Sequence, residues 1–559
     1  MLSYLVNKRA LILMINFFTS PDQYKHWQIN ISGNVATLLL NVDENENPTL
    51  GYTLKLNSYD LGVDIELNDA VQRLRFEHPE VGAVIITSAK DRVFSAGANI
   101  QMLGQLSHVE KVNFCKYTNE TRISIEDASL NSGQTYLCAI NGPASGGGYE
   151  LALATEHIIL VDDGATAIAL PEVPSLAVLP GTGGLTRVID KRHVRRDRAD
   201  FFCTTSEGVR GRRALDWNLV DELATRSNLV SQTHSRAKSF AQKNNRRISA
   251  NGIKLEPINR KIEKNLISYD LIEILINRDL RTATFKIKGP DKTSNLSIKY
   301  IYSIGCKFWP LAFARELDDA ILHLRFNEPE IGTWVLTSEG NHDAMEAIDK
   351  IMLKNYKNWF IHEIILNLKR TFKRLDISSR SLIALIEPNS CFTGTLAELA
   401  LAADTSYMLD KAIEENTEKK TTFCLTGINF GYLSMSNGLS RISSRFLGNK
   451  GHIEKIKLIG GKQLEAKEAE ELGLVTFAPD DIDWDDEIRI ALEARASFSP
   501  DALSAMEANL RFGGPETIES KIFSRLSAWQ NWLFQRPNAN TSLESYGTGK
   551  QPTFDRNRV

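Results

Sequence analysis

The period of the apolar positions changes along the first third of the chain, and this change predicts alternating strands and helices. Residues 26–56 alternate apolar and polar side chains, which is typical of half-buried strands. From Asp60 to Phe76 the apolar positions recur at helical spacing. Short apolar runs at Gly82–Thr87, Tyr136–Ile140 and His157–Val161 predict buried strands. Such alternation indicates βαβ units, an α/β fold and a mainly parallel sheet.

Parts of this pattern occur twice. LNDAVQRLRFEHPEVGAVIITS, from Leu67, matches LDDAILHLRFNEPEIGTWVLTS, from Leu317, without a gap. Further along, ELALATE from Glu150 matches ELALAAD from Glu398. Matches that keep the same order at similar spacing indicate an internal duplication.

A weaker third match pairs GGLTR, from Gly183, with NGLSR, from Asn437. The series predicts two homologous domains, at residues 20–260 and 261–559, the second of which ends in C-terminal helices. The segment 235–265 is polar and basic, and we expect it to connect the two domains.

Two glycine-rich segments of the first copy follow predicted strands. They are FSAGANIQML, from Phe94, and NGPASGGGYELALA, from Asn141, which leads into a helix predicted at Tyr149–Thr155. Helix N-termini carry unpaired N–H groups and the positive end of a dipole, and glycine lets a ligand approach the backbone closely. Two such corners facing one point would form an oxyanion hole. Either segment alone is explained equally well as an ordinary tight turn.

Two carboxylates accompany the glycines. Glu150 falls in the first turn of the second helix, and Glu172 falls in a loop-like segment, LPEVPSLAVLPGTGG. Taken singly, Glu150 is explained as a residue that complements the helix dipole, and Glu172 as a surface acid. Taken together beside an oxyanion hole, the pair could hold and polarise water by general acid–base catalysis.

Other motifs that carry chemistry are missing from the sequence. No G-x-G-x-x-G stands between a strand and a helix, so no dinucleotide site is predicted. HEIIL at His362 is not the HExxH of a zinc protease, and no CxxC pair occurs among the six cysteines. We therefore expect neither a metal site nor a redox dithiol.

The motifs FSAGANI, GPASGGGYEL, PEV and PGTGGLTR, in this order, resemble the enoyl-CoA hydratase/isomerase (crotonase) superfamily over about residues 26–225. The resemblance implies an α/β fold of two tandem crotonase-like domains, each a spiral of ββα repeats. It places the oxyanion hole at the amides of Ala98 and Gly147, and the catalytic carboxylates at Glu150 and Glu172. It also implies substrate-binding positions, which are Ser95, Ala96, Gly97, Asn99, Ile100, Gly146 and Gly148.

The resemblance further points to Cys115 as an active-site residue. From the sequence alone, a single cysteine on a helix is more simply a small packed side chain.

The duplicated form, 559 residues long, resembles a group of this superfamily that acts in aerobic benzoate degradation through CoA thioesters. The resemblance implies that 2,3-epoxy-2,3-dihydrobenzoyl-CoA and two waters become 3,4-didehydroadipyl-CoA semialdehyde and formate. The resemblance therefore implies a carbon–carbon lyase that opens an epoxide. The resemblance implies a homodimeric assembly. It implies no metal, flavin or nicotinamide cofactor, since CoA is part of the substrate.

The second copy departs from the motif. Thr395 stands at the position of Gly147, and the segment that matches FSAGAN is roughly HDAMEA, without its glycine. Glu398 is retained, but no Pro-Glu precedes Asn437. We therefore expect the second copy to be catalytically silent and to act as a scaffold.

Composition argues against nucleic acid as a partner. The hydrophobic fraction is 42%, the net charge is -3 and the pI is about 6.4. These values fit a globular protein and argue against nucleic-acid binding. No run approaches about 18 apolar residues and the N-terminus lacks a signal-peptide pattern, so we expect no membrane association, with Met14 as an alternative start. The scattered cysteines fit a reducing cytoplasm.

Although the net charge is small, basic residues gather in one part of the sequence. A basic cluster comprises Lys191, Arg192, Arg195, Arg196, Arg198, Arg210, Arg212 and Arg213. The simpler interpretation is a solvated helix face, and the alternative is a contact for the phosphates of a nucleotide-bearing ligand.

Three other functions remain open. An enoyl-CoA hydratase or isomerase acting on another acyl-CoA would share every motif and differ in chain length and duplication. A multifunctional β-oxidation protein would need a dinucleotide fingerprint, which residues 261–559 lack. A non-catalytic CoA-binding scaffold would have lost the glycines or glutamates of the first copy, but all are present.

Overall fold

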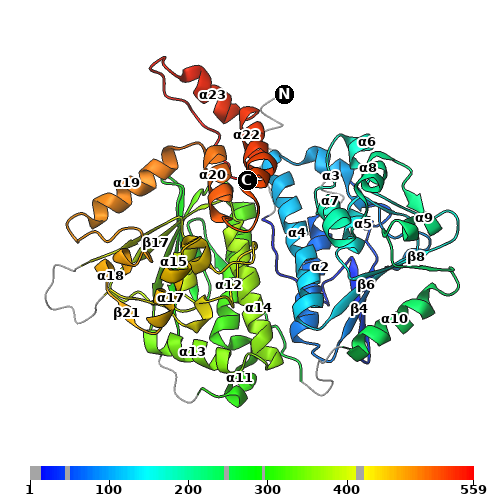
Figure 1. Ribbon diagram of the computed structural model, residues 1–559, viewed down its shortest axis with the longest axis horizontal. Coiled ribbons are helices and arrows are strands. Elements are labelled where there is room, and N and C mark those ends of the chain that lie inside the picture. Colours follow the sequence, from blue (N-terminus) through cyan, green and yellow to red (C-terminus); the bar gives the residue numbers. More distant parts are fainter. Residues whose placement is uncertain (1–13, 45–50, 244–250, 292–295, 411–420) are drawn as a thin grey trace. The chain divides into compact units, whose positions relative to one another are not determined.

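The computed structural model describes residues 14–44, 51–243, 251–291, 296–410 and 421–559 (Figure 1). The chain divides into two compact units, and each is described by itself. The N-terminal unit is Asn16–Leu255, and the C-terminal unit is Glu256–Val559 together with the chain before Asn16.

A six-stranded sheet forms the centre of the N-terminal unit. In sheet order its strands are β1 (Trp27–Ser32), β2 (Val35–Leu40), β4 (Ala83–Ser88), β6 (Thr135–Ile140), β8 (His157–Val161) and β11 (Glu222–Ala224). The first two strands form an antiparallel hairpin, and from β2 onward neighbouring strands are parallel. The mainly parallel sheet predicted from the sequence is confirmed for this unit.

Helices cover both faces of this sheet. They are α2 (Leu61–Phe76), α4 (His108–Asn131) and α10 (Leu229–Lys243). Because successive side chains of a strand point to opposite faces, β4 sends Ala83 and Ile85 into the core beneath α10, whereas Val84 and Ile86 join the main core of the unit. Asp60 caps α2 by accepting a hydrogen bond from the Gly62 amide at 2.9 Å, so the predicted helix is confirmed.

The predicted connection at 235–265 is wrong for its first residues. Residues 235–243 belong to α10, and residues 244–250 lie outside the described residues. Thr233, Ala237 and Ala241 are buried at helical spacing on one face of α10. The basic side chains lie on the other, exposed face, which makes the segment look like a linker when it is read as composition alone.

Short elements at one edge of the N-terminal unit carry the candidate site. Its short strands are β3 (Ser58–Tyr59), β5 (Gly97–Ala98), β7 (Ala144–Ser145), β9 (Ala167–Ala169) and β10 (Val209–Arg210). Its short helices are α3 (Ile100–Gln105), α5 (Gly147–Leu153), α6 (Glu172–Leu176), α7 (Gly184–Thr186), α8 (Arg196–Thr204) and α9 (Gly211–Asp216). The helix predicted at Tyr149–Thr155 therefore starts and ends two residues earlier, at α5.

The C-terminal unit is built on a seven-stranded sheet. In sheet order its strands are β12 (Lys261–Ile262), β13 (Leu266–Ser268), β14 (Ile272–Asn277), β15 (Thr282–Lys288), β16 (Thr333–Glu339), β17 (Ser381–Ile386) and β19 (Thr405–Met408). Neighbours up to β15 pair antiparallel, and neighbours from β15 onward pair parallel. A small sheet joins β18 (Phe392–Thr393), β20 (Phe423–Cys424) and β21 (Gln463–Leu464).

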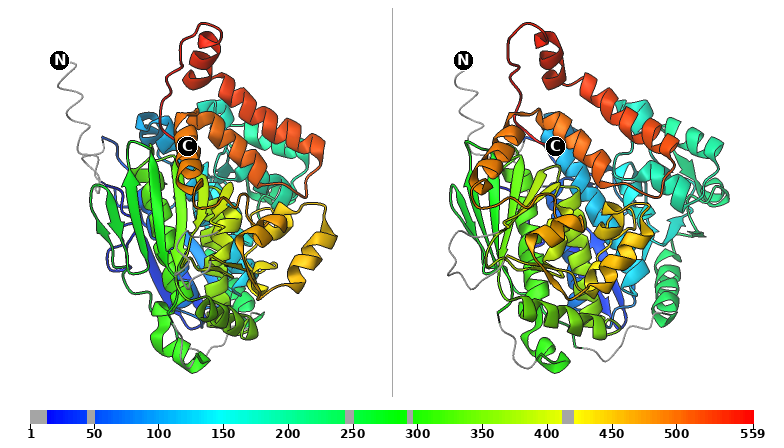
Figure 2. Two further views of the ribbon diagram at one scale, coloured as in Figure 1. Left: turned by 90° about the vertical axis from the view of Figure 1, so that its left-hand side faces the viewer. Right: turned by 60° about the vertical axis from the view of Figure 1, so that its left-hand side comes forward.

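Helices complete the C-terminal unit, and Figure 2 shows several of them stacked beside its sheet. The longer ones are α12 (Trp309–Asn327), α13 (His342–Lys354), α14 (Trp359–Asp376), α19 (Trp484–Ser497) and α20 (Pro500–Arg511). The shorter ones are α11 (Ile298–Ile304), α15 (Ala397–Ala402), α16 (Arg441–Arg445), α17 (Lys450–Leu458), α18 (Ala466–Glu471), α21 (Ile518–Ser520), α22 (Ser527–Phe534) and α23 (Pro537–Ser545). Trp484 of α19 packs against Ile383 and Tyr407 of the sheet.

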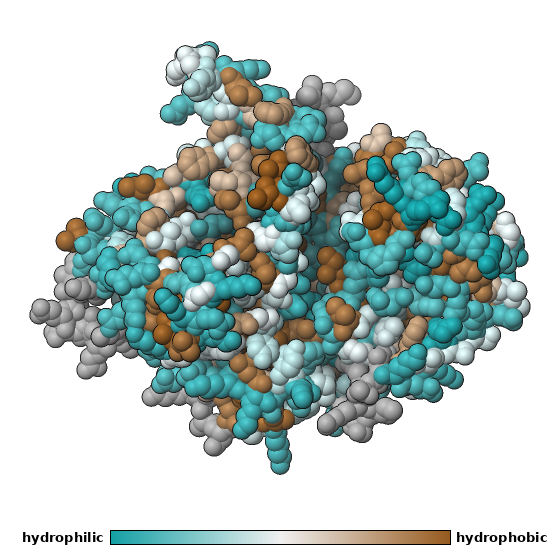
Figure 3. All heavy atoms as spheres, in the orientation of Figure 1, coloured by the Kyte–Doolittle hydropathy of each residue, from teal (hydrophilic) through white to brown (hydrophobic). Residues whose placement is uncertain are grey.

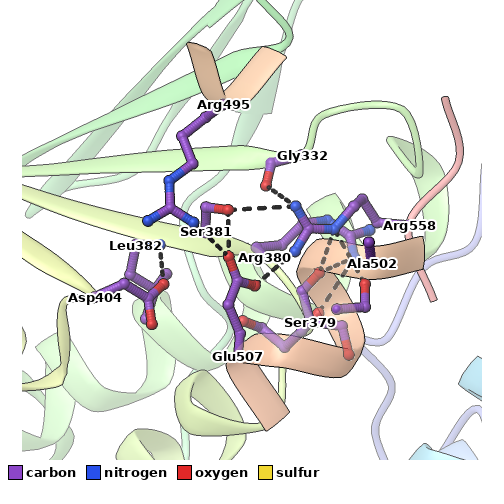
Figure 4. A network of polar contacts seen from close by, with 12 residues as sticks. Gly332, Ser379, Arg380, Ser381, Leu382, Asp404, Arg495, Ala502, Glu507 and Arg558 are labelled. Carbon is purple, nitrogen blue, oxygen red and sulfur yellow. Dashed lines mark hydrogen bonds and ion pairs between the residues drawn. The ribbon is translucent and has the colours of Figure 1, made fainter. Parts of the chain in front are cut away.

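The end of the chain is tied into the C-terminal unit by a buried polar network (Figure 4). The guanidinium of Arg558 donates to Glu507 of α20 at 2.6 Å and to the carbonyl of Gly332 at 3.2 Å. Ser381 of β17 donates to the same carboxylate. Because these groups are almost wholly buried, their mutual pairing is what allows them to stay inside the protein.

Across the described ranges, no helix is long and apolar enough to cross a membrane.

Candidate active site

The first glycine-rich corner follows β4 and forms the short strand β5. Gly97 has a φ of 81°, which favours glycine, and Ala98 pairs with Tyr59 of β3. The amide of Asn99 donates to the Tyr59 carbonyl at 2.9 Å. Since successive amides of an extended strand point in opposite directions, the amide of Ala98 is directed away from β3.

The second corner precedes α5. Gly146 has a φ of 53°, and its carbonyl accepts the amide of Glu150 at 3.0 Å as the helix begins. Gly147 and Gly148 stand in the first turn, where backbone amides have no acceptor within the helix. Such a turn presents donors and the positive end of the helix dipole to its surroundings.

The two corners are in direct contact. A Cβ atom on Gly97 would lie 2.8 Å from the amide nitrogen of Gly147 and 2.6 Å from the Ser145 carbonyl oxygen. A Cβ atom on Gly148 would lie 2.5 Å from the Ser95 carbonyl oxygen. Only glycine allows this approach, so the structure brings together the two segments singled out in the sequence.

The remaining candidate substrate-binding residues divide into buried and exposed ones. Ser95 is buried, donates to the Asn57 carbonyl at 2.8 Å and accepts the Gly97 amide at 3.1 Å. Asn99 is buried and caps α3 by accepting the Met102 amide. These two side chains shape the corner. Ala96 and Ile100 are exposed, so a ligand can reach them.

Glu150 is buried and held by the loop before α7. Its Oε1 accepts the amides of Thr182 at 3.0 Å and Gly184 at 2.7 Å, and its Oε2 accepts the Thr182 hydroxyl. A Cβ atom on Gly184 would lie 2.8 Å from Oε1, so the glycine lets the backbone close around the carboxylate. The PGTGG loop therefore fixes the orientation of Glu150.

Glu172 begins α6, and the loop predicted for it is wrong in this respect. The helix is five residues long and carries Pro174 in its first turn, where proline is tolerated, so no helical period marks it in the sequence. Burial, together with the charge of Glu150, raises the pKa of the Glu172 carboxyl to about 7. Its Oε2 is buried without a hydrogen-bond partner among the described residues, and its Oε1 lies against Gly146.

Cys115 lies near Glu150. It sits on α4, partly buried, with Sγ 3.9 Å from where a Cβ on Gly181 would be. Burial, and then the charge of Glu150, raises the pKa of the Cys115 thiol to about 11. The thiol is therefore protonated near neutral pH, and a thiolate nucleophile is not favoured.

Two residues without a sequence motif adjoin the second corner. Arg122 of α4 is 1% exposed, and its Nη2 donates to the Tyr59 hydroxyl at 2.9 Å and to the Gly147 carbonyl at 3.0 Å. Neither Arg122 nor Tyr59 lies in a sequence motif, because their contacts join positions far apart in the chain. Only Arg122 itself, a charged residue in a helix that must face the core, could have drawn attention.

The basic cluster is largely paired with acids. Lys191 lies 3.0 Å from both Glu126 and Glu156, and Arg192 lies 2.9 Å from Asp221. Other members of the cluster pair with Asp197 or Asp216 or stack on Trp217. This pairing fits the simpler interpretation of a solvated surface.

Metal ligands do not gather in the part of the chain that the structure describes. In that part, no group of three or more His, Cys, Asp or Glu residues is placed to hold an ion. All six cysteines are free thiols.

The C-terminal unit has a corner of the same shape with different occupants. Gly394 has a φ of 51°, close to the 53° of Gly146, and Thr395 follows it. The Thr395 amide donates to Asp349 Oδ2 at 3.0 Å, and the Thr395 hydroxyl donates to Asp349 Oδ1 at 2.7 Å. A side-chain carboxylate thus takes up the amide at this corner.

Its glutamate is also engaged differently. Glu398 lies 2.8 Å from Arg441 and accepts the Asn429 side-chain amide at 2.7 Å, with all three side chains buried. Burial raises the pKa of the Glu398 carboxyl, but both of its oxygens are bound by neighbouring side chains and it is 1% exposed, so a ligand has no access to it.

The chain is similar to proteins of known family. The sequence pattern described as enoyl-CoA hydratase/isomerase matches residues 49–285. The chain is 53% identical over 557 residues to a benzoyl-CoA-dihydrodiol lyase of Aromatoleum evansii, and the match covers 99% of this chain and 100% of that protein.

Among solved structures, the chain is similar to an enoyl-CoA hydratase of Geobacillus kaustophilus HTA426. That match has 31% identity and a TM-score of 0.35, and it covers 39% of this chain and 75% of the other. An enoyl-CoA hydratase of Bacillus anthracis matches with 24% identity and a TM-score of 0.34, over 39% of this chain and 76% of the other.

Proposed function

The chain belongs to the enoyl-CoA hydratase/isomerase family, and we propose that it opens the ring of 2,3-epoxy-2,3-dihydrobenzoyl-CoA. With two waters the products are 3,4-didehydroadipyl-CoA semialdehyde and formate, in aerobic benzoate degradation. The observation that carries the proposal is the contact between the two amide corners, beside the paired carboxylates Glu150 and Glu172. The end-to-end similarity to a benzoyl-CoA-dihydrodiol lyase supports this choice of substrate.

The thioester carbonyl oxygen would bind between the amides of Ala98 and Gly147. Both donors are backbone amides held in regular elements, β5 and α5, so little reorganisation is needed when negative charge moves onto the oxygen. A donor of this kind is worth about 2.7–4 kcal/mol to a transition state. Charge drawn toward the carbonyl activates the adjacent ring carbons, where the epoxide is opened.

The two glutamates would divide the proton transfers. Glu172, with a pKa of about 7, carries a proton in about half of the molecules near neutral pH, and we assign it as the acid that protonates the epoxide oxygen. Glu150, oriented by three donors, would accept a proton from the attacking water. A second water and cleavage of a carbon–carbon bond then release formate. Cys115 would line the site as a neutral thiol.

An apolar rim next to Glu172 suits an aromatic acyl group. Val173, Leu176, Val178 and Leu179 follow Glu172 and expose between 36% and 64% of their surface. Figure 3 shows apolar side chains gathered on the N-terminal unit near α6 and α8. Covering such side chains with a ring would remove apolar surface from water and so favour binding.

The direct test is formate release after addition of the epoxide thioester, with no metal, flavin or nicotinamide supplied. Glu150→Gln and Glu172→Gln are each expected to lower turnover by at least about 100-fold, because each removes one proton-transfer group. A variant that releases formate at nearly the normal rate excludes that glutamate from the mechanism.

The family match itself favours a second candidate, hydration or isomerisation of another enoyl-CoA. The same amides and glutamates would serve that reaction. Crotonyl-CoA assayed beside the epoxide thioester separates the two, and faster turnover of crotonyl-CoA favours the alternative. A non-catalytic CoA-binding scaffold predicts no turnover of either.

The C-terminal half would be a degenerate copy of the N-terminal half. We place the two tandem crotonase-like domains near residues 20–260 and 261–559, in line with the repeat. The Thr395 amide, which matches that of Gly147, is occupied by Asp349, and Glu398 is neutralised by Arg441. This copy would be silent in catalysis and serve as scaffold.

Assembly and location complete the proposal. We expect a cytoplasmic homodimer. Exposed apolar side chains near the C-terminus support association, with Ile518 77% and Phe523 75% exposed. Light scattering on the purified protein would measure the mass of the assembly.

A further inference from the structure

Tyr59 touches both halves of the proposed oxyanion hole. Its backbone pairs with β5 at Ala98, and its carbonyl accepts the Asn99 amide at 2.9 Å. Its side chain reaches the other corner, where a Cβ atom on Gly147 would overlap the Tyr59 hydroxyl oxygen. One residue therefore sets the position of the first corner by its backbone and of the second by its side chain.

Arg122 binds both Tyr59 and Gly147 and so holds them in this arrangement. Its Nη2 donates to the Tyr59 hydroxyl and to the Gly147 carbonyl, at 2.9 Å and 3.0 Å. Hydrogen bonds from a charged donor are stronger than neutral ones, and the planar guanidinium has little freedom to turn. The guanidinium also lies over the Tyr59 ring, 5.4 Å from its centroid.

The arginine is itself held in place. Its Nη1 lies 3.9 Å from Asp64 Oδ1 and donates to the Thr118 carbonyl at 3.3 Å, and Thr118 also donates to Asp64. Burial raises the pKa of the Tyr59 hydroxyl, so the phenol stays neutral and can accept from Arg122. Asp64, Arg122 and Tyr59 form a continuous buried chain that ends at Gly147.

From these contacts we infer that Tyr59 and Arg122 are positioning residues for the thioester carbonyl. This inference rests on the proposed function. They touch no reacting atom, but they hold the amides of Ala98 and Gly147 at a fixed separation. A displacement of about 1 Å in such a group can cost about 100-fold in rate, so the clamp bears directly on turnover.

The matching corner of the C-terminal unit is filled by a side chain of its own unit. The match of ELALATE with ELALAAD places Thr395 at the position of Gly147. The Thr395 amide donates to Asp349 Oδ2 at 3.0 Å. The backbone amide that Tyr59 and Arg122 adjoin in the N-terminal unit is thus bound by a carboxyl group in the C-terminal unit.

The test measures the stretching frequency of the carbonyl of a bound thioester, which does not depend on turnover. Infrared difference spectra of carbonyl-¹³C benzoyl-CoA, which lacks the epoxide, report how strongly the hole polarises the carbonyl. In the wild-type protein we expect a lower stretching frequency than in solution. Tyr59→Phe keeps the ring but removes the hydroxyl, and we expect the frequency shift to shrink and kcat to fall about tenfold, with KM within about twofold.

A second variant and a control separate positioning from stability. Arg122→Lys keeps the charge but replaces the planar guanidinium, and its frequency shift should shrink as that of Tyr59→Phe does. Tyr24→Phe loses a hydroxyl that donates to Asp69 at 2.5 Å in the same unit, and it should keep both shift and kcat. Wild-type shifts in both Tyr59→Phe and Arg122→Lys overturn the positioning role. A wild-type protein that shows no shift overturns the proposed oxyanion hole, and the positioning role with it.

Discussion

At the scale of single residues, Glu172 is the proposed catalytic residue whose carboxyl changes protonation near neutral pH. Burial and the charge of Glu150 raise its pKa to about 7. Below that pH the carboxyl holds its proton, and above it the carboxylate forms. If Glu172 is the acid, kcat/KM for formate release should fall about tenfold per pH unit above about pH 7.

The pH profile can be checked with two variants. Glu172→Gln should abolish the break near neutral pH, and Glu150→Gln should move it to lower pH because the neighbouring charge is gone. Glu156→Gln changes a carboxylate that pairs with Lys191, and it should leave the profile unchanged. Activity that instead rises through pH 7 would assign Glu172 as the base.

Sequence motifs reach some of these residues and miss others for a physical reason. Ala98, Gly147 and Glu150 lie within contiguous segments whose glycines report a local backbone shape. Tyr59 and Arg122 act through contacts that the fold makes across 63 positions of sequence, and nothing in their own neighbourhood records them. The raised pKa of Glu172 is likewise a product of burial, which the residue type cannot show.

At the scale of elements, the strand-to-helix corners require glycine for close approach. Gly147→Ala would place a methyl group on the Tyr59 hydroxyl and push α5 away from β5. We expect formate release to fall by at least about 100-fold and stability to drop by about 1–3 kcal/mol. Turnover assays and chemical denaturation would measure the two effects.

Gly104→Ala is the matched control for this change. Gly104 lies inside α3 with open space around a new Cβ atom. Alanine there should keep activity and add up to about 1 kcal/mol of stability, because glycine is a poor helix former. If Gly147→Ala behaved like Gly104→Ala, the two corners would not form a fitted hole.

Strands and helices could be predicted from the sequence where burial produces a regular spacing of apolar residues. His157–Val161 is β8 as predicted, and β4 and β6 lie within one residue of the predicted runs. The helices α10 and α6 are among those that the sequence pattern did not predict. The basic residues of α10 hide its small buried face, and α6 is too short to show any period.

At the scale of the whole molecule, the two halves differ in what fills equivalent corners. The repeat suggests two copies of one fold, and both sheets continue from antiparallel into parallel strands. Sequence comparison could show that Thr395 replaces Gly147. It could not show that Asp349, 46 positions earlier, accepts a hydrogen bond from the Thr395 amide.

Asp349 can be tested as a built-in substitute for a bound anion. Asp349→Ala removes a buried carboxylate but leaves its donors, the Thr395 amide and the hydroxyls of Thr395 and Thr426. Leaving these groups unpaired should lower the free energy of unfolding by about 1–3 kcal/mol. Burial raises the pKa of Asp349 to about 7, so above that pH formate has both the shape and the charge of the missing group. Above pH 7 we expect millimolar formate to restore much of the lost stability.

The specificity of this rescue decides what the corner recognises. Asp349→Asn fills the same space, so formate should add nothing to its stability, and the wild-type protein should likewise show no gain. Sodium chloride at matched ionic strength controls for screening in all three proteins. Stabilisation of Asp349→Ala by formate but not by chloride would mean that the corner in the C-terminal unit still binds a carboxylate. Equal effects of the two salts would mean that Asp349 is an ordinary buried acid whose contacts reflect packing rather than an inherited anion site.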